Sequence, residues 1–260
     1  MSLTGKEIKK EFDAERIVID PYDDKKLNYT GISYDVSIGD EMAVLVTEST
    51  VRAFIKAADQ YPPHDLTPAF RLTPRECAVQ HWLAHHIGKQ EGHNHFPTMF
   101  SMGKKVKDLP TTIDPRNPPD TFKFDIKEVI KAANQIGISG PKLDSFPMIP
   151  GVLYLATTKE KIGSDHYAPH IHGKSSLARL GLSVHLTAGF GEPGFKYQWT
   201  LEMTVAHPFL IVPGMRIGQV EFEPVQGEIV NYDQRGSYGK QEGPTGSKMD
   251  RYFNEDGSPK

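Results

Sequence analysis

Two basic residues and two serines lie close together at the start of the segment GKSSLARLGLSVHLTAGFGEPGF, residues 173–195. The four are Lys174, Ser175, Ser176 and Arg179. Lysine and arginine supply positive charge and the serine hydroxyls supply neutral donors, so this set suits an oxyanion such as a phosphate. A capped helical turn with solvated charges would use the same residues, and the spacing alone leaves both interpretations open.

Glu202 lies in the mostly apolar segment TLEMTV, which the pattern predicts to be a strand. A carboxylate in such a strand either points outward or is held for a purpose, and on the pattern alone the outward orientation is favoured. A partly buried glutamate next to a cation would instead be able to carry a proton. Glu202 is therefore a candidate general base.

Residues 189–194, GFGEPG, match the dinucleotide-binding pattern G-x-G-x-x-G. That pattern needs a strand before it and the N-terminus of a helix after it, so that backbone N–H groups face the pyrophosphate. The residues that follow, 195–205, are rich in β-forming types, and Pro193 precedes the last glycine. The segment is predicted to be a turn between strands.

Five histidines fall within fifteen residues: His81, His85, His86, His93 and His95. His81 and His85 are spaced as metal ligands on one helix face can be. The sequence HWLAH lacks the glutamate of H-E-x-x-H, so a polar helix face followed by a loop is favoured over a zinc site. Cys77 is expected to be a small buried residue and not a nucleophile.

The composition limits the class of protein. The 260 residues carry a formal net charge of −3 and one cysteine, so an intramolecular disulfide is excluded and no general nucleic-acid or anionic-membrane surface is indicated. No apolar run approaches the ~20 residues of a membrane span, and the N-terminus lacks an apolar signal region. We expect a soluble, cytoplasmic protein.

The pattern of elements changes twice along the chain. An opening helix follows Thr4, strands cover 16–20 and 32–38, and helices with irregular loops dominate from about 49 to 140. Two of these helices are expected to begin after Thr73, ending near Ile87, and after Asp125. Strands are then predicted at 152–158, 183–188, 198–205, 216–225 and 228–232, the spacing of an all-β sandwich or barrel.

The segment 173–195 resembles the signature G-[RK]-S-S-L-A-R-L-G-L…V-H-x-T-A-G-x-I-D-P-G-[FW] of the dCTP deaminases and the related trimeric dUTPases. Companion motifs follow in order: TLE at 200–202, PGMRIGQVEF at 213–222, and Y-x-x-R…Q-x-G-P between 232 and 244. Upstream, 149–162 and 32–39 resemble core strands of the family. The resemblance covers roughly 1–45 and 146–248.

The resemblance implies a mainly β fold, namely a distorted β-barrel or jelly-roll of the dUTPase-like type with an N-terminal helix. It implies one domain over 1–260, with 50–145 as a helical and loop insertion and 236–260 as a flexible tail over the active site. It also implies a homotrimer whose active sites are shared between subunits.

The implied activity is the hydrolytic deamination of dCTP to dUTP and ammonia. The implied catalytic residues are Glu202 as general base, Arg179, Ser175 and the backbone carbonyl of Ala188. The implied substrate-binding residues are Lys174, Ser175, Ser176, Arg179, Glu192, Gln219, Tyr232, Lys240 and Gln241. Magnesium would be bound through the triphosphate. A zinc route is not expected, because the chain has one cysteine and no H-x-E.

Three departures from the family pattern affect this interpretation. Glu192 replaces the aspartate that in dUTPases activates water at the α-phosphate, and the extra methylene moves its carboxylate by ~1 Å. Phe190 replaces a large residue, often arginine. Ser237 replaces a phosphate-binding lysine, for which Lys240 is a candidate substitute. A bifunctional enzyme that forms dUMP and pyrophosphate is therefore the second hypothesis. A nucleotide-binding regulator that acts through 50–145 is the third, and a purely structural trimer the fourth.

Overall fold

The computed structural model describes residues 1–59, 72–90, 109–138, 140–232 and 236–260, which form two compact units. The β unit comprises Met1–Met42, Leu155–Met203 and Gly214–Thr245. The helical unit comprises Ala43–Tyr154, Thr204–Pro213 and Gly246–Lys260. The prediction of one domain with an insertion at 50–145 stays a prediction.

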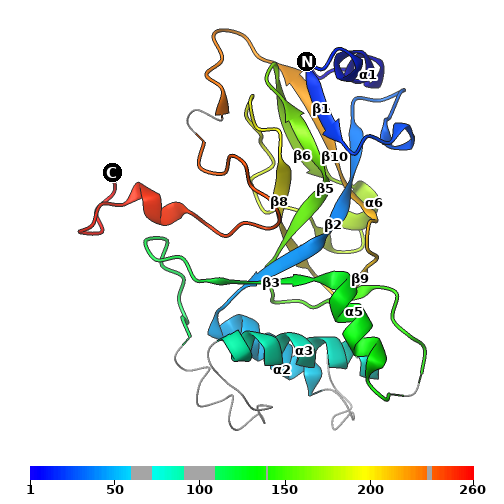
Figure 1. Cartoon of the computed structure of the whole chain (residues 1–260), viewed down its shortest axis with the longest axis vertical. Helices are drawn as coiled ribbons and strands as arrows, with labels where there is room; N and C mark the ends of the chain where they lie inside the picture. Colours follow the sequence, from blue (N-terminus) through cyan, green and yellow to red (C-terminus); the bar gives the residue numbers. More distant parts are fainter. Residues whose placement is uncertain (60–71, 91–108, 139, 233–235) are drawn as a thin grey trace. The chain divides into compact units, whose positions relative to one another are not determined.

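The β unit is built on a sheet whose strands run in the order β6-β10-β2-β5-β8-β7, with β1 also paired to β5 (Figure 1). The strands are β1 (Ile17–Asp20), β2 (Tyr34–Leu45), β5 (Tyr154–Ser164), β6 (Tyr167–Gly173), β7 (Leu182–Ser183), β8 (Gln198–Val205) and β10 (Arg216–Pro224). The helices are α1 (Gly5–Asp13), the 3-10 turn η1 (Asp24–Lys26) and α6 (Ser175–Ala178). The sequence-based expectation of a mainly β fold with an N-terminal helix is confirmed.

Strand β8 shows why the sheet has one apolar and one polar face. Successive side chains of a strand point to opposite faces. Trp199, Leu201 and Met203 are accordingly buried, whereas Gln198, Thr200 and Glu202 are only half-buried. Glu202 thus shares its face of β8 with Gln198 and Thr200.

The helical unit packs α2 (Glu48–Ala58) against α3 (Pro74–Gln90), and α3 against α5 (Ile126–Gln135). It also contains the two-stranded antiparallel sheet of β4 (Phe146–Met148) and β9 (Phe209–Ile211), the strand β3 (Thr121–Asp125), which pairs with β2, and the 3-10 turn η3 (Met249–Tyr252). Its core includes the fully buried side chains of Phe54, Leu83, Ile126, Phe146 and Tyr154.

The predicted helix starts are confirmed. Thr4 caps α1, and the Asp125 carboxylate accepts from the Lys127 and Glu128 N–H groups at 2.7 and 2.9 Å. Thr73 and Glu76 form a reciprocal capping box, in which the Thr73 N–H donates to Glu76 Oε2 at 2.5 Å. The end predicted for this helix at Ile87 is wrong, because α3 continues to Gln90.

Two predicted strands are also wrong. Of 183–188, only Ser183 belongs to a strand, because its hydroxyl donates to the His185 carbonyl at 2.9 Å and the chain turns. Residues 228–232 form no strand, since the Tyr232 N–H donates to the Pro193 carbonyl at 2.9 Å and not to a ladder. In both segments, side-chain and turn contacts replace strand pairing.

Candidate active site

The first half of the signature forms the short helix α6, which Lys174 precedes and Arg179 follows. Ser175, Ser176 and Arg179 are exposed. In the described part of the chain, no hydrogen bond or ion pair joins any of these three side chains to Glu202. One copy of the chain therefore presents the predicted oxyanion-binding side chains and the predicted base separately.

Lys174 is held at the end of β6 by a carboxylate of β2. Its Nζ donates to Asp35 Oδ1 at 2.6 Å, and Arg216 Nη1 donates to Asp35 Oδ2 at 3.2 Å. Gln219 of β10 lies directly opposite Asp35 in the β10–β2 ladder. The structure thus brings the predicted residues Lys174 and Gln219 to one place on the sheet.

Glu202 lies against the second half of the signature. Burial raises the pKa of its carboxyl above the ordinary glutamate value, and hydrogen bonds from its own backbone N–H and that of Leu186 offset part of this rise. No cation forms an ion pair with it among the described residues. Leu186 stands two residues before Ala188, which is exposed. The structure therefore brings Glu202 to the segment that contains Ala188.

The backbone of Tyr232 bonds to the turn that ends the signature and that contains Glu192. The Phe195 N–H donates to the Glu192 carbonyl at 3.0 Å, and the Tyr232 N–H donates to the neighbouring Pro193 carbonyl at 2.9 Å. Gly194 has φ +97°, and a Cβ there would lie 2.1 Å from Asn231 Oδ1. Only glycine allows this approach of the tail to the turn.

Gln241 contacts β8 directly. Its Nε2 donates to the Gln198 carbonyl at 2.6 Å, and the Gly243 N–H donates to Gln198 Oε1 at 3.2 Å. The Thr245 N–H donates to Thr200 Oγ1 at 3.2 Å. Residues 241–245 therefore lie along the polar face of β8 that also carries Glu202. Lys240 is exposed with φ 58°, and its side chain forms no hydrogen bond or ion pair with the other predicted site residues among those described.

The G-x-G-x-x-G match at 189–194 is a turn between strands, as predicted. The next element is strand β8 and not a helix, and the backbone of the segment pairs with β6 through Ile171 N–H to Gly189 O and Gly191 N–H to Pro169 O, both at 2.8 Å. Its glycines serve close packing, because a Cβ on Gly191 would lie 2.4 Å from the Trp199 ring.

The histidine-bearing helix α3 forms no metal cluster within the described ranges. His86 stacks on Trp82, with ring centroids 3.8 Å apart, and its Nδ1 hydrogen-bonds to the Trp82 carbonyl at 2.8 Å. His93 and His95 lie outside the described residues. Cys77 is buried, as predicted, and burial raises the pKa of its thiol to about 11.

Sequence reasoning missed Asp35 and Arg216. A signal existed, because Asp35 is the one charged residue in the predicted strand ISYDVSI, and Arg216 is the only one in the stretch PGMRIGQ. What the sequence does not give is the pairing of β2 with β10, which brings these two side chains together.

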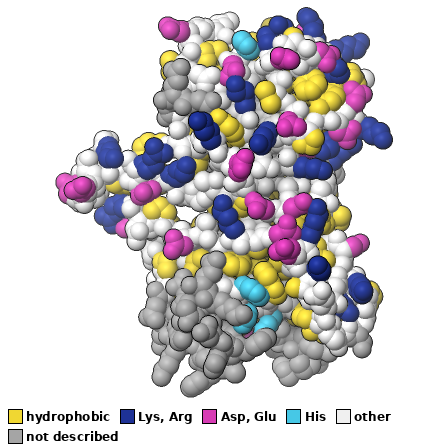
Figure 2. Space-filling view, in the orientation of Figure 1, with side chains coloured by type: hydrophobic (Ala, Val, Ile, Leu, Met, Phe, Trp, Pro, Cys, Tyr) yellow, Lys and Arg dark blue, Asp and Glu magenta, His cyan; other side chains and the backbone are white. Residues whose placement is uncertain are grey.

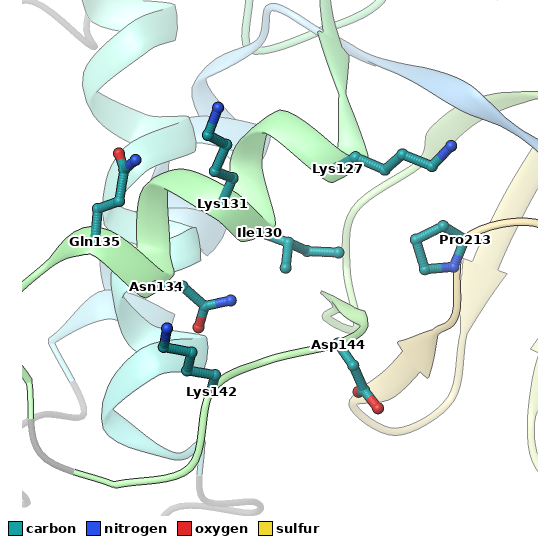
Figure 3. A pocket seen from close by; sticks show the side chains of 8 residues that line it. All are labelled: Lys127, Ile130, Lys131, Asn134, Gln135, Lys142, Asp144 and Pro213. Carbon is teal, nitrogen blue, oxygen red and sulfur yellow. The ribbon is translucent and has the colours of Figure 1, made fainter.

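A hollow of about 460 Å³ lies in the helical unit, and none of the residues that line it is a predicted site residue (Figure 3). It is lined by Lys127, Ile130, Lys131, Asn134, Gln135, Lys142, Asp144 and Pro213. Figure 3 shows Lys127 and Lys131 extending away from each other. These two lysines therefore do not converge on one anion.

Side chains of both charge signs are interspersed among the described residues on the face shown in Figure 2, without a large area of one sign. This agrees with the formal net charge of −3. No helix among the described residues is both long and apolar enough to cross a membrane.

The sequence matches proteins of one family. The sequence model of the dCTP deaminase-like family matches residues 110–225. A relative from Leptospira biflexa, named "dCTP deaminase, dUMP-forming", is 45% identical over 94 residues, which are 36% of this chain and 53% of that protein. The chain thus spans about half the length of this relative.

Two other relatives with the same name are covered more fully. The protein from Cytophaga hutchinsonii is 36% identical over 135 residues, covering 48% of this chain and 78% of the relative. The protein from Clostridium beijerinckii is 33% identical over 150 residues, covering 58% and 86%. The crystal structure of 2'-deoxycytidine 5'-triphosphate deaminase from Agrobacterium tumefaciens is 12% identical with a TM-score of 0.44, covering 92% of this chain and 53% of that one. The family assignment depends on the sequence relatives and not on this weaker structural similarity.

Proposed function

The chain belongs to the dCTP deaminase-like family, and from this premise we propose that it hydrolyses the amino group of dCTP to give dUTP and ammonia. The observation that carries the proposal is the environment of the Glu202 carboxylate. This carboxylate is half-buried beside the signature segment, its pKa is raised, and it forms no ion pair in the described part of the chain. A raised pKa makes it a stronger base than an exposed glutamate.

In the proposed reaction, Glu202 takes a proton from water as the water oxygen bonds to C4 of the cytosine ring. Glu202 passes this proton to ring N3, then takes the proton of the new C4 hydroxyl and gives it to the amino nitrogen, so that the C4–N bond breaks, ammonia leaves and C4 keeps a carbonyl oxygen. The carbonyl of Ala188 orients the water, and the Ser175 hydroxyl and the Arg179 guanidinium stabilise the charge that develops. One water is consumed for each ammonia released.

We also propose that a neighbouring subunit of a homotrimer completes each site. Ser175 and Arg179 are exposed and do not contact Glu202 within the chain, so a second copy is needed to bring them together. Leu180, Leu186 and Phe190 of the same segment are 62, 57 and 60% exposed, which leaves apolar surface for a partner chain to cover. Sedimentation velocity tests this, and a monomer at assay concentrations would contradict it.

The triphosphate would be bound by Lys174 and Ser176, with Gln219 beside them. Tyr232 and Gln241 would close on the nucleotide from the tail. Lys240 is exposed on that tail. Asp35, the carboxylate next to Lys174, is already shared by two cations and is not free to hold a metal ion. Phosphate oxygens are therefore the fitting ligands for Mg²⁺. When bound, Mg²⁺ would supply positive charge that neutralises the triphosphate.

The test is to incubate the protein with dCTP and Mg²⁺ and to measure ammonia together with the nucleotide products. Glu202→Gln is expected to lower turnover by roughly 10²- to 10⁴-fold, because the base is lost while the shape of the side chain is kept. Glu228→Gln is the matched control, since Glu228 is an exposed glutamate of the β unit.

An active Glu202→Gln variant would contradict the assigned base. If the protein releases ammonia from none of the cytosine nucleotides tested, the proposed activity is overturned. Tight binding of unaltered dCTP without turnover would instead favour the regulator hypothesis.

A second product is also a candidate, because the three relatives described above are all named dUMP-forming. In that case the same protein would also split dUTP into dUMP and pyrophosphate. Glu192 weighs against this step, because its longer side chain stands where the family has an aspartate. The nucleotide measured in the same assay separates the two: dUTP supports deamination alone, and dUMP with pyrophosphate supports the bifunctional reaction.

A further inference from the structure

Three charged side chains from three strand ends of the β unit meet beside α6. Asp35 belongs to β2, Arg216 begins β10, and Lys174 follows the last residue of β6. Both carboxylate oxygens of Asp35 are engaged, with Lys174 Nζ at 2.6 Å from Oδ1 and Arg216 Nη1 at 3.2 Å from Oδ2. Each cation uses one side of the same carboxylate.

An irregularity in β10 makes this meeting possible. Gln219 lies opposite Asp35, Gly218 opposite Val36 and Arg216 opposite Ser37, so the register shifts between Arg216 and Gly218. Without the shift, residues 216 and 219 would point to opposite faces, because side chains alternate along a strand. The shift places Arg216 on the face of Asp35 and Gln219, and redirecting a side chain in this way is a known role of a β-bulge.

The three residues leave hydrogen-bonding capacity for an anion. Two cations share one carboxylate, so the formal charges of the three groups sum to +1. The side chains of Arg216 and Lys174 are 43 and 26% exposed, whereas that of Asp35 is 16% exposed. The carboxylate therefore lies deeper than the cations, and the remaining ammonium and guanidinium N–H groups face solvent. Exposed N–H donors of this kind match phosphate oxygens.

A purely structural ion pair in the same unit has a different arrangement. Arg16, also 43% exposed, pairs with the Glu11 carboxylate through two nitrogens, and that carboxylate is 5% exposed and also accepts from the Tyr167 hydroxyl. That pair has one cation for one carboxylate. Arg16 is therefore a control for Arg216 with equal exposure and charge. Tyr167 begins β6 and Lys174 follows its end, so the two ion pairs are roughly 20 Å apart along that strand.

We propose that Arg216 is a second cation of the phosphate-binding site, and that Asp35 is the positioning residue that holds it beside Lys174. The ligand class is an inorganic or nucleoside polyphosphate. The inference rests on the proposed function in so far as that function makes Lys174 a phosphate-binding residue.

The test is calorimetric binding of inorganic tripolyphosphate and of dCTP to the full chain, which requires no turnover. Arg216→Gln is expected to weaken tripolyphosphate binding by about tenfold, the size of one charge-assisted hydrogen bond. Arg216→Lys, which keeps the charge, should recover most of this loss. Arg16→Gln should change binding by less than about twofold, because surface charges at this distance are largely screened.

Asp35→Asn tests the positioning role through a double-mutant cycle. Once the carboxylate is gone, Arg216 is no longer held beside Lys174, and Arg216→Gln should then weaken binding by less than about twofold. If Arg216→Gln weakens binding tenfold both in the parent and in Asp35→Asn, Asp35 does not position Arg216. Circular dichroism of each variant establishes that the fold is kept.

The outcomes separate this proposal from the proposed function. If the parent binds tripolyphosphate and Arg216→Gln binds it equally well, the role of Arg216 is overturned while deamination stands. If the parent releases no ammonia but binds tripolyphosphate through Arg216, the deamination proposal falls and the phosphate-binding role is supported. If the parent binds neither dCTP nor tripolyphosphate, both are overturned.

Discussion

Strand β8 and helix α3 each place ionisable side chains in partly buried positions, but His86 and Cys77 of α3 have local packing partners or simple burial to explain them, whereas Glu202 of β8 is a half-buried carboxylate with a raised pKa. On α3, His86 bonds to the Trp82 carbonyl and stacks on its ring, and Cys77 is buried with a pKa raised to about 11. On β8, burial raises the pKa of Glu202, and no described cation compensates for it. The comparison shows that residue type and spacing only suggest a site, whereas a carboxylate whose pKa is raised by burial and that has no ion-pair partner is evidence for one.

The two regions are also held in place differently. In the β unit, backbone segments approach each other through glycines: a Cβ on Gly163 of β5 would lie 1.7 Å from the Phe195 carbonyl oxygen. In the helical unit, long side chains bridge the helices: Arg75 is 7% exposed and donates to the carbonyls of Ala133 and Ile138 at 3.1 and 2.5 Å. Substitutions at these points test the comparison.

The largest expected effect on stability is that of Gly163→Ala. The three atoms nearest to the added methyl group are backbone atoms of Phe195 and Lys196, which lead into β8. We expect it to lower the free energy of unfolding by more than about 2 kcal/mol, because a rigid backbone cannot move aside as a flexible side chain does. Chemical denaturation measures this.

Gly137→Ala in the helical unit is the matched control, because a Cβ there meets nothing within 4 Å. Its effect should stay within about 0.5 kcal/mol. Equal stabilities of the two variants would show that the β unit does not depend on this close approach.

A smaller effect is expected for Arg75→Met in the helical unit. The substitution keeps most of the buried volume but leaves two carbonyls without their donor, so about 2 kcal/mol of unfolding free energy should be lost. Turnover of dCTP should stay within about twofold of the parent, since none of the proposed catalytic residues lies in α3. A large loss of turnover in a folded variant would break the distinction between the two regions.

Local patterns predicted much of the fold. The β-forming composition of QWTLEMTV predicted β8 with its bounds, and the caps at Thr4, Thr73 and Asp125 gave three helix starts. These features depend on neighbours in the sequence, which is why the pattern contains them. The sequence analysis missed strand β6 because Pro169 and Gly173, two residues that disfavour strands, lie within it. A proline is tolerated there because β6 is an edge strand of the sheet.

The candidate site was predictable in part for the same reason. The signature residues are contiguous, so the family resemblance selected Ser175, Arg179 and Ala188 as candidates before any fold was known, and their roles stay predictions. The link between Asp35 and Arg216 depends on the register of β2 with β10 and on the shift between Arg216 and Gly218. Contacts between residues 181 positions apart are set by the sheet and not by the local sequence.

The central claim, that a desolvated Glu202 is the base, is tested most directly by titrating this carboxyl and comparing it with the pH dependence of kcat/KM for dCTP. Difference infrared spectroscopy of the parent against Glu202→Gln gives the titration. Because burial raises the pKa, the midpoint should lie above that of an exposed glutamate, and activity should fall as the pH decreases through that midpoint, where the base becomes protonated. A midpoint at or below the ordinary glutamate value, or an acid limb that does not coincide with it, would contradict the account.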